Sequence, residues 1–155
     1  MAVVKDDAYG HGLDAVLPML VDEGVTWFGA LDPAVAVNIV TRHPSARAFA
    51  WHLTADSELG AAVRAGVDLG VTDQHALERV IEAAESSGRV ARVHLQLDTG
   101  LHRGGTAVAQ WAAIVARAVD AERAGTARVE GIFTHLAEAS DADDSRAIAA
   151  FHAAA

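Results

Sequence analysis

The chain has 155 residues, of which 52% are hydrophobic, and its formal net charge is −9. Its length suits one domain with a substantial core rather than two, and an acidic chain without a basic stripe argues against nucleic acid as a partner. The absence of cysteine excludes disulfides and thiolate metal sites, and no apolar run reaches the ~20 residues of a membrane span, so we expect a soluble, cytoplasmic protein.

Short apolar runs alternate with amphipathic patterns along the whole sequence. Such runs are typical of buried parallel strands, and they predict strands at 2–4, 25–30, 46–51, 67–71, 90–97 and 129–134. The amphipathic patterns predict helices at 13–21, 54–65, 73–85, 107–123 and 145–155, and glycine follows most of them as a stop signal. The alternation indicates an α/β protein whose parallel sheet is covered by helices.

The regular spacing of the predicted strands favours a (β/α) barrel. Five of the six strands start roughly 21 to 23 residues apart, which indicates repeated βα units. A closed barrel needs eight units and ~250 residues, so we expect an incomplete TIM-type barrel of about six units, with both ends of the chain looking cut. A small open sheet of six units is the alternative.

Lys5 is the most informative residue, because it is the only lysine and directly follows an apolar run. An arginine stays protonated, whereas a lysine at the end of a buried strand can lose its proton and form a Schiff base. Two further stretches, 96–105 and 134–141, also place polar residues after predicted strands. In a barrel all three stretches would meet at the active-site edge.

These stretches resemble motifs of the alanine racemase family. Val-Val-Lys-Asp-Asp-Ala-Tyr-Gly-His-Gly at 3–12 is similar to the family's cofactor-lysine signature. Leu-Asp-Thr-Gly-Leu-His-Arg-Gly-Gly at 97–105 resembles its strand and loop that carry a substrate-contacting arginine, and Glu-Gly-Ile-Phe-Thr-His-Leu-Ala at 130–137 resembles its later strand that ends in a histidine. Taken singly, each residue would more often be an ordinary surface or core residue, but three motifs in the family's order are specific.

The resemblance implies a barrel enzyme that uses pyridoxal 5'-phosphate (PLP) to interconvert L- and D-alanine through an aldimine and a carbanion, which supplies D-alanine for peptidoglycan. Lys5 would be the catalytic residue and hold PLP. Tyr9 would bind the cofactor phosphate, Arg103 the cofactor phenolate and the substrate carboxylate, and His135 would pack beside the pyridine ring. The resemblance also implies a small amino-acid substrate, a homodimer for the full enzyme, and no membrane partner.

Two departures from the family pattern are visible. Where many members carry a carbamylated lysine, this chain has Gln96, which we expect to orient Arg103 through an amide hydrogen bond or a bound anion. Residues 1–155 would form a partial barrel domain that binds PLP, without the family's C-terminal β-domain and its second catalytic tyrosine. Tyr9 is the only tyrosine here.

Other interpretations are weaker or remain open. Gly10-x-Gly12-x-x-Ala15 loosely matches a dinucleotide fingerprint, but five residues separate it from the strand. No pattern of metal ligands is present, so we expect no metal. The serious alternative to a racemase is a truncated or degenerate barrel fragment that binds PLP without catalysis and self-associates through open strand edges.

Overall fold

A computed structural model describes residues 1–154, and its sheet has the parallel strands that the sequence predicts. Six strands form the main sheet, and each pairs with the one before it in the chain once the two-residue strand β6, described below, is left aside. The strand order therefore has no reversal. The six strands are β1 (Ala2–Val3), β2 (Trp27–Leu31), β3 (Arg47–Ala50), β4 (Asp68–Val71), β5 (Ala91–Asp98) and β7 (Ala127–Phe133). A doubly wound sheet would reverse its strand order, so the arrangement is that of a barrel wall.

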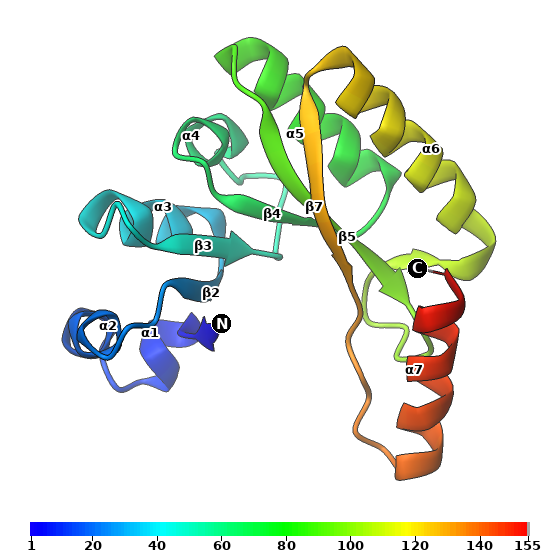
Figure 1. The fold of residues 1–155 in the computed structure, drawn as a ribbon, viewed down its shortest axis with the longest axis horizontal. Coiled ribbons are helices and arrows are strands. Elements are labelled where there is room, and N and C mark those ends of the chain that lie inside the picture. Colours follow the sequence, from blue (N-terminus) through cyan, green and yellow to red (C-terminus); the bar gives the residue numbers. More distant parts are fainter. Residues whose placement is uncertain (155) are drawn as a thin grey trace.

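Helices follow the strands and lie along the outer side of the curved sheet (Figure 1). The helices are α1 (Lys5–Tyr9), α2 (Leu13–Asp22), α3 (Pro33–Arg42), α4 (Leu59–Arg64), α5 (Gln74–Ser87), α6 (Val108–Ala124) and α7 (Asp141–Ala154). The predicted six βα units are therefore confirmed. Within residues 1–154 the sheet stays open, because β1 pairs only with β2 and β7 only with β5.

Several helix boundaries differ from the sequence prediction. α3 was not predicted, although Asp32 followed by Pro33 is a recognisable helix start with proline at its first position. α4 begins at Leu59 rather than near residue 54, because Thr54 and Ser57 bond to each other through their hydroxyls in the preceding loop. A short strand, β6 (Thr106–Ala107), pairs with the end of β5 and was also not predicted.

The hydrophobic core lies between the sheet and its helices. Side chains alternate between the two faces of a strand, and the residues of one face, such as Phe28, Leu69 and Leu95, are almost completely buried under the helices. Complete burial of one such side chain contributes about 1.5–3 kcal/mol. The opposite face forms the inner wall of the barrel and carries the polar and aromatic side chains described below.

Candidate active site

Lys5 follows directly on the first strand at the carboxyl edge of the sheet. The residue before it, Val4, is 2% exposed and anchors the strand end in the core. The Lys5 side chain is 35% exposed, and its amine lies 4.0 Å from a carboxylate oxygen of Asp6 and 5.8 Å from the ring centroid of Tyr9. The amine is therefore held near the mouth of the barrel, beside the tyrosine.

The four residues after Lys5 form a left-handed helical turn. Asp6, Asp7, Ala8 and Tyr9 all have φ between 52° and 55°, a region that costs an L-residue roughly 1–2 kcal/mol. Aspartate tolerates this region better than most residues, and the Asp7 carboxylate also accepts the backbone N–H of Leu13 at 2.7 Å. This bond ties the turn to the first residue of α2 and fixes where Lys5 and Tyr9 project.

Arg103 and His135 meet at the same edge although they come from different loops. Nη2 of Arg103 lies 3.0 Å from both ring nitrogens of His135. A guanidinium can only donate, so the imidazole accepts through its unprotonated nitrogen. Burial lowers the pKa of His135 below its usual value near 6.5, and the charges of Arg103 and Lys5 lower it further, while Glu138 acts in the opposite direction. The histidine is thus kept neutral at physiological pH.

One cavity of about 540 Å³ joins three of the four predicted site residues. Lys5, Arg103 and His135 all line it, together with Gln96 and Thr134. Tyr9 does not line the cavity; its side chain stands beside the Lys5 amine and is largely exposed, at 59%. A cavity of about 560 Å³ between α3 and the loop before α4 is slightly larger, but it contains no lysine, arginine or histidine. The cavity lined by Lys5, Arg103 and His135 is therefore the better candidate for the active site.

Gln96 holds the loop of Arg103 rather than its guanidinium. The side chain is buried, and its Nε2 donates to the carbonyl oxygen of Gly104 at 3.4 Å. Of the two arrangements expected, an amide hydrogen bond to Arg103 or a bound anion between the two side chains, the direct bond is not present within residues 1–154. The amide is instead directed at the backbone one residue beyond the arginine, so it acts on the position of the whole loop.

Aromatic side chains form the floor of the cavity, and the sequence analysis did not assign them to the site. Phe49, Trp51 and Phe133 line the cavity. The ring centroid of Phe49 lies 5.5 Å from that of Trp51 and 5.3 Å from that of Phe133, and the rings of Phe49 and Phe133 meet edge to face. The signal was present in the sequence, because Phe49 and Trp51 alternate along one predicted strand and so share one face.

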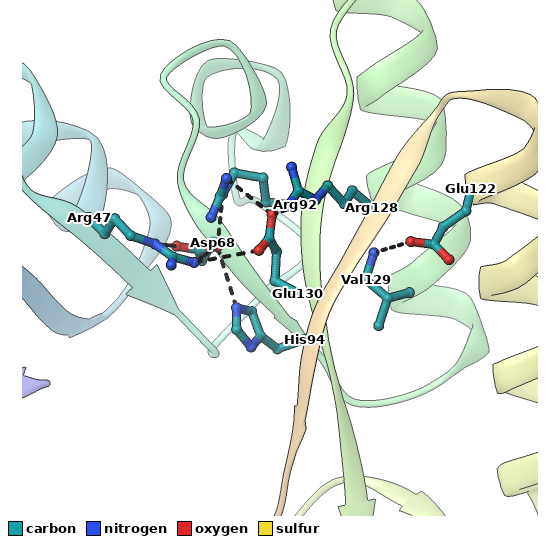
Figure 2. A network of polar contacts seen from close by, with 8 residues as sticks. All are labelled: Arg47, Asp68, Arg92, His94, Glu122, Arg128, Val129 and Glu130. Atoms are coloured by element: carbon teal, nitrogen blue, oxygen red, sulfur yellow. Dashed lines mark hydrogen bonds and ion pairs between the residues drawn. The ribbon is translucent and has the colours of Figure 1, made fainter. Parts of the chain in front are cut away.

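Below this floor the inner wall carries an ion network (Figure 2). The fully buried Asp68 carboxylate accepts hydrogen bonds from Arg47 and Arg92 at 3.0–3.1 Å. Glu130 adds ion pairs to Arg92 and Arg128, both at 3.1 Å. The network therefore links β3, β4, β5 and β7 on the inner face.

Within residues 1–154 no group of three His, Asp or Glu side chains has the arrangement of a metal site. None of the described helices combines the length and apolar character that crossing a membrane requires.

Comparison with known proteins gives a consistent result. The family profile described as "Alanine racemase, N-terminal domain" matches residues 1–155. The chain is 42% identical over 143 residues to the alanine racemase of Beutenbergia cavernae and 40% identical over 157 residues to that of Thermobifida fusca, covering 92% and 99% of this chain. These alignments cover 38% and 42% of the two relatives, so the chain spans about two fifths of their length.

Solved structures agree with the sequence matches. The crystal structure of alanine racemase from the D-cycloserine producer Streptomyces lavendulae superimposes with a TM-score of 0.94 at 34% identity, over 99% of this chain and 41% of that one. The alanine racemase of Streptomyces coelicolor A3(2) gives a TM-score of 0.93 at 36% identity, over 99% and 42%.

Proposed function

The chain belongs to the alanine racemase family, whose N-terminal domain it matches, and from this premise we propose that it binds PLP through Lys5 and takes part in the interconversion of L- and D-alanine. The observation that carries the proposal is the shared cavity of Lys5, Arg103 and His135. An amine, a guanidinium and a neutral imidazole around one space form a donor set suited to a carbonyl cofactor and an anionic substrate.

The residues present fit PLP in both shape and chemistry. The aromatic floor of Phe49, Trp51 and Phe133 offers apolar surface to a planar ring. Lys5 supplies the only side-chain amine in the chain, and it would bond to the cofactor aldehyde. When bound, PLP supplies an electron sink that makes removal of the Cα proton of an amino acid feasible.

Each remaining residue has a proposed task. The Lys5 amine, when free, would accept the Cα proton of the substrate. Arg103 has no carboxylate within ion-pair distance in the described part of the chain, so its guanidinium is available for the cofactor phenolate and the substrate carboxylate. The exposed phenol of Tyr9 would donate to the cofactor phosphate. His135 would pack beside the pyridine ring and accept from Arg103.

The second candidate function is PLP binding without turnover. It is favoured by the single tyrosine of the chain, because racemisation needs an acid or base on each face of the substrate and the family's second catalytic tyrosine is not among these residues. The unpaired outer edges of β1 and β7 within residues 1–154 would also favour self-association. A purely monomeric protein in sedimentation experiments would contradict the self-association.

Covalent trapping tests the cofactor proposal. The chain is incubated with PLP, reduced with borohydride and examined by peptide mass analysis. We expect a reduced cofactor on Lys5, and none at that position in Lys5→Arg. This control is informative, because the arginine variant keeps only one amine, the α-amino group of the chain, and the residue that carries it, Met1, also lines the cavity. Labelling of Met1 alone would contradict the proposal.

Turnover separates the two candidates. D-alanine formed from L-alanine and PLP is measured for the chain of residues 1–155 and for Lys5→Ala. We expect a labelled Lys5 with little or no turnover for this length of chain. Turnover that disappears in Lys5→Ala would show that the non-catalytic candidate is wrong.

A further inference from the structure

The loop that carries Arg103 leaves the end of β5 and returns to the same strand. It runs from Thr99 to Gly105, after which β6 pairs with the last residues of β5, Leu97 with Thr106 and Asp98 with Ala107. Such a loop can be placed only by contacts at its base. The structure supplies different contacts for its two halves.

The Asp98 carboxylate organises the first half of the loop. Its Oδ1 accepts the backbone N–H groups of Gly100 at 3.0 Å and His102 at 3.1 Å, and its Oδ2 lies 2.8 Å from Nδ1 of His102. Three donors within four residues thus converge on one side chain. They hold His102 at φ 56°, a left-handed conformation that this residue would otherwise rarely adopt.

The second half of the loop is held from the opposite side. Gln96 donates to the carbonyl of Gly104 at 3.4 Å. A Cβ on Gly105 would lie 2.9 Å from the backbone nitrogen of Asp98, so the returning chain packs directly on β5. Arg103 is therefore bracketed, because the residue before it is fixed by Asp98 and the residue after it by Gln96.

The Asp98 side chain is sheltered although the loop is exposed. It is 12% exposed, whereas the side chain of its partner His102 is 81% exposed. Burial alone would raise the pKa of Asp98, but the hydrogen bonds from Gly100 and His102 outweigh it and lower the pKa below its usual value. The carboxylate thus stays charged at neutral pH, where its hydrogen bonds are strongest.

We propose that Asp98 is a positioning residue, whose carboxylate fixes the loop so that the Arg103 guanidinium reaches His135 at the cavity. The inference deepens the proposed function and rests on it for the role of Arg103. Asp98 itself does not line the cavity, and its carboxylate bonds to Gly100 and His102. Its effect is transmitted through the backbone of His102.

Nuclear magnetic resonance of the full chain tests the inference without any cofactor. Asp98→Ala removes all three acceptor contacts, whereas Asp98→Asn keeps an oxygen that can accept both backbone N–H groups. We expect amide exchange at Gly100 and His102 to be about tenfold faster or more in Asp98→Ala, and the nuclear Overhauser contact between the Arg103 side chain and the His135 ring to disappear. Asp98→Asn should retain that contact.

The outcomes are distinct. An Arg103–His135 contact that is unchanged in Asp98→Ala would overturn the inference. Should Asp98→Ala not fold, Asp98→Val takes its place, since valine suits the end of a strand and likewise accepts no hydrogen bond; an unchanged Arg103–His135 contact there would overturn the inference equally. Failure of the proposed function would appear elsewhere, as the absence of PLP on Lys5 in the unmodified chain.

Discussion

Nε2 of His94 lies 3.4 Å from Oδ1 of Asp68, and the same imidazole packs on Phe49, with 5.1 Å between the ring centroids. His94 therefore connects a fully buried carboxylate to an aromatic ring that lines the candidate active site. Because protein interiors are closely packed and transmit displacements, the ion network supports the floor of the cavity as well as the sheet.

Asp68→Asn should destabilise the protein at pH 7 by about 2 kcal/mol. Burial alone would raise the pKa of Asp68, but hydrogen bonds from His94, Arg47 and Arg92 lower it from 3.8 to about 2. A carboxyl whose pKa is lowered by folding stabilises the protein above its unfolded pKa, and this contribution is lost as the pH falls from about 4 towards 2. Urea unfolding at pH 7, 5, 4 and 3 measures both effects.

Asp120→Asn is the matched control for the Asp68 prediction. Asp120 pairs with Arg123 at 3.3 Å, but both side chains are more than half exposed, so its loss should change the free energy of unfolding by less than about 0.5 kcal/mol. A cost of Asp68→Asn that stayed constant down to pH 3 would contradict the linkage argument.

Arg103→Gln should raise the pKa of His135. Burial is the largest cause of the lowered pKa, and the Arg103 charge comes next, followed by that of Lys5. Removal of the guanidinium charge should therefore move the pKa upward without restoring it fully, and Lys5→Gln should have a smaller effect. The measurement is a pH titration of the histidine ring signals, with His135→Gln to identify the signal.

The same shift predicts how stability depends on pH. A histidine whose pKa is lowered by folding opposes the folded state where the unfolded chain is protonated, so the free energy of unfolding should fall below pH ~6.5. This loss should be smaller in His135→Gln than in the unmodified chain.

Arg128→Gln is the control for the rise in the pKa of His135 expected in Arg103→Gln, because Arg128 belongs to the ion network and does not act on His135. A change in the pKa of His135 as large as that in Arg103→Gln would refute the local explanation.

The repeated strand and helix pattern could be predicted because local chemistry determines it. Apolar runs such as 67–71 bury both faces of a strand, and periodic patterns such as 107–123 bury one face of a helix. β6 could not be predicted, since two residues carry no periodicity and Thr106 is placed by its pairing with Leu97. The left-handed turn after Lys5 was also missed, because Asp-Asp-Ala-Tyr contains no glycine to signal positive φ.

The candidate site was predictable as a set of residue types but not as a geometry. Lys5, Arg103 and His135 follow three different strands, and parallel strands bring such positions to one edge. Their distances depend on loops whose contacts the sequence does not reveal. Gln96 illustrates this, because its bond to Gly104 depends on the return of the loop to β5.

Asp6→Gly should stabilise the protein by about 1 kcal/mol. Asp6 has φ 52° and is exposed, and glycine adopts this conformation without the steric cost that an L side chain meets. Glu82→Gly, in the middle of α5 and also exposed, should instead destabilise by about 1 kcal/mol. Urea unfolding of both variants checks the contrast, and a loss of stability in Asp6→Gly would show that the turn is not strained.

Gly70→Ala should destabilise the protein by about 1–3 kcal/mol and narrow the cavity. A Cβ at Gly70 would lie 2.8 Å from the Cβ and 3.0 Å from the Cα of Trp51, and 3.0 Å from the ring of Phe49, so the main chain at Trp51 would have to move. Near-ultraviolet circular dichroism should report the displaced tryptophan. Labelling of Lys5 by PLP should be slower, since Trp51 and Phe49 both form the cavity floor.

Gly60→Ala provides the opposite case for the same substitution. Gly60 lies in α4, and a Cβ there would meet only the flexible end of Arg64, at 3.3 Å. Alanine is favoured over glycine inside a helix, so this variant should gain up to about 1 kcal/mol and leave the labelling rate of Lys5 unchanged. If Gly70→Ala and Gly60→Ala lost the same stability, the close approach of β4 to Trp51 could not be the cause of the loss in Gly70→Ala. The floor of the cavity would then tolerate a larger side chain than its packing implies.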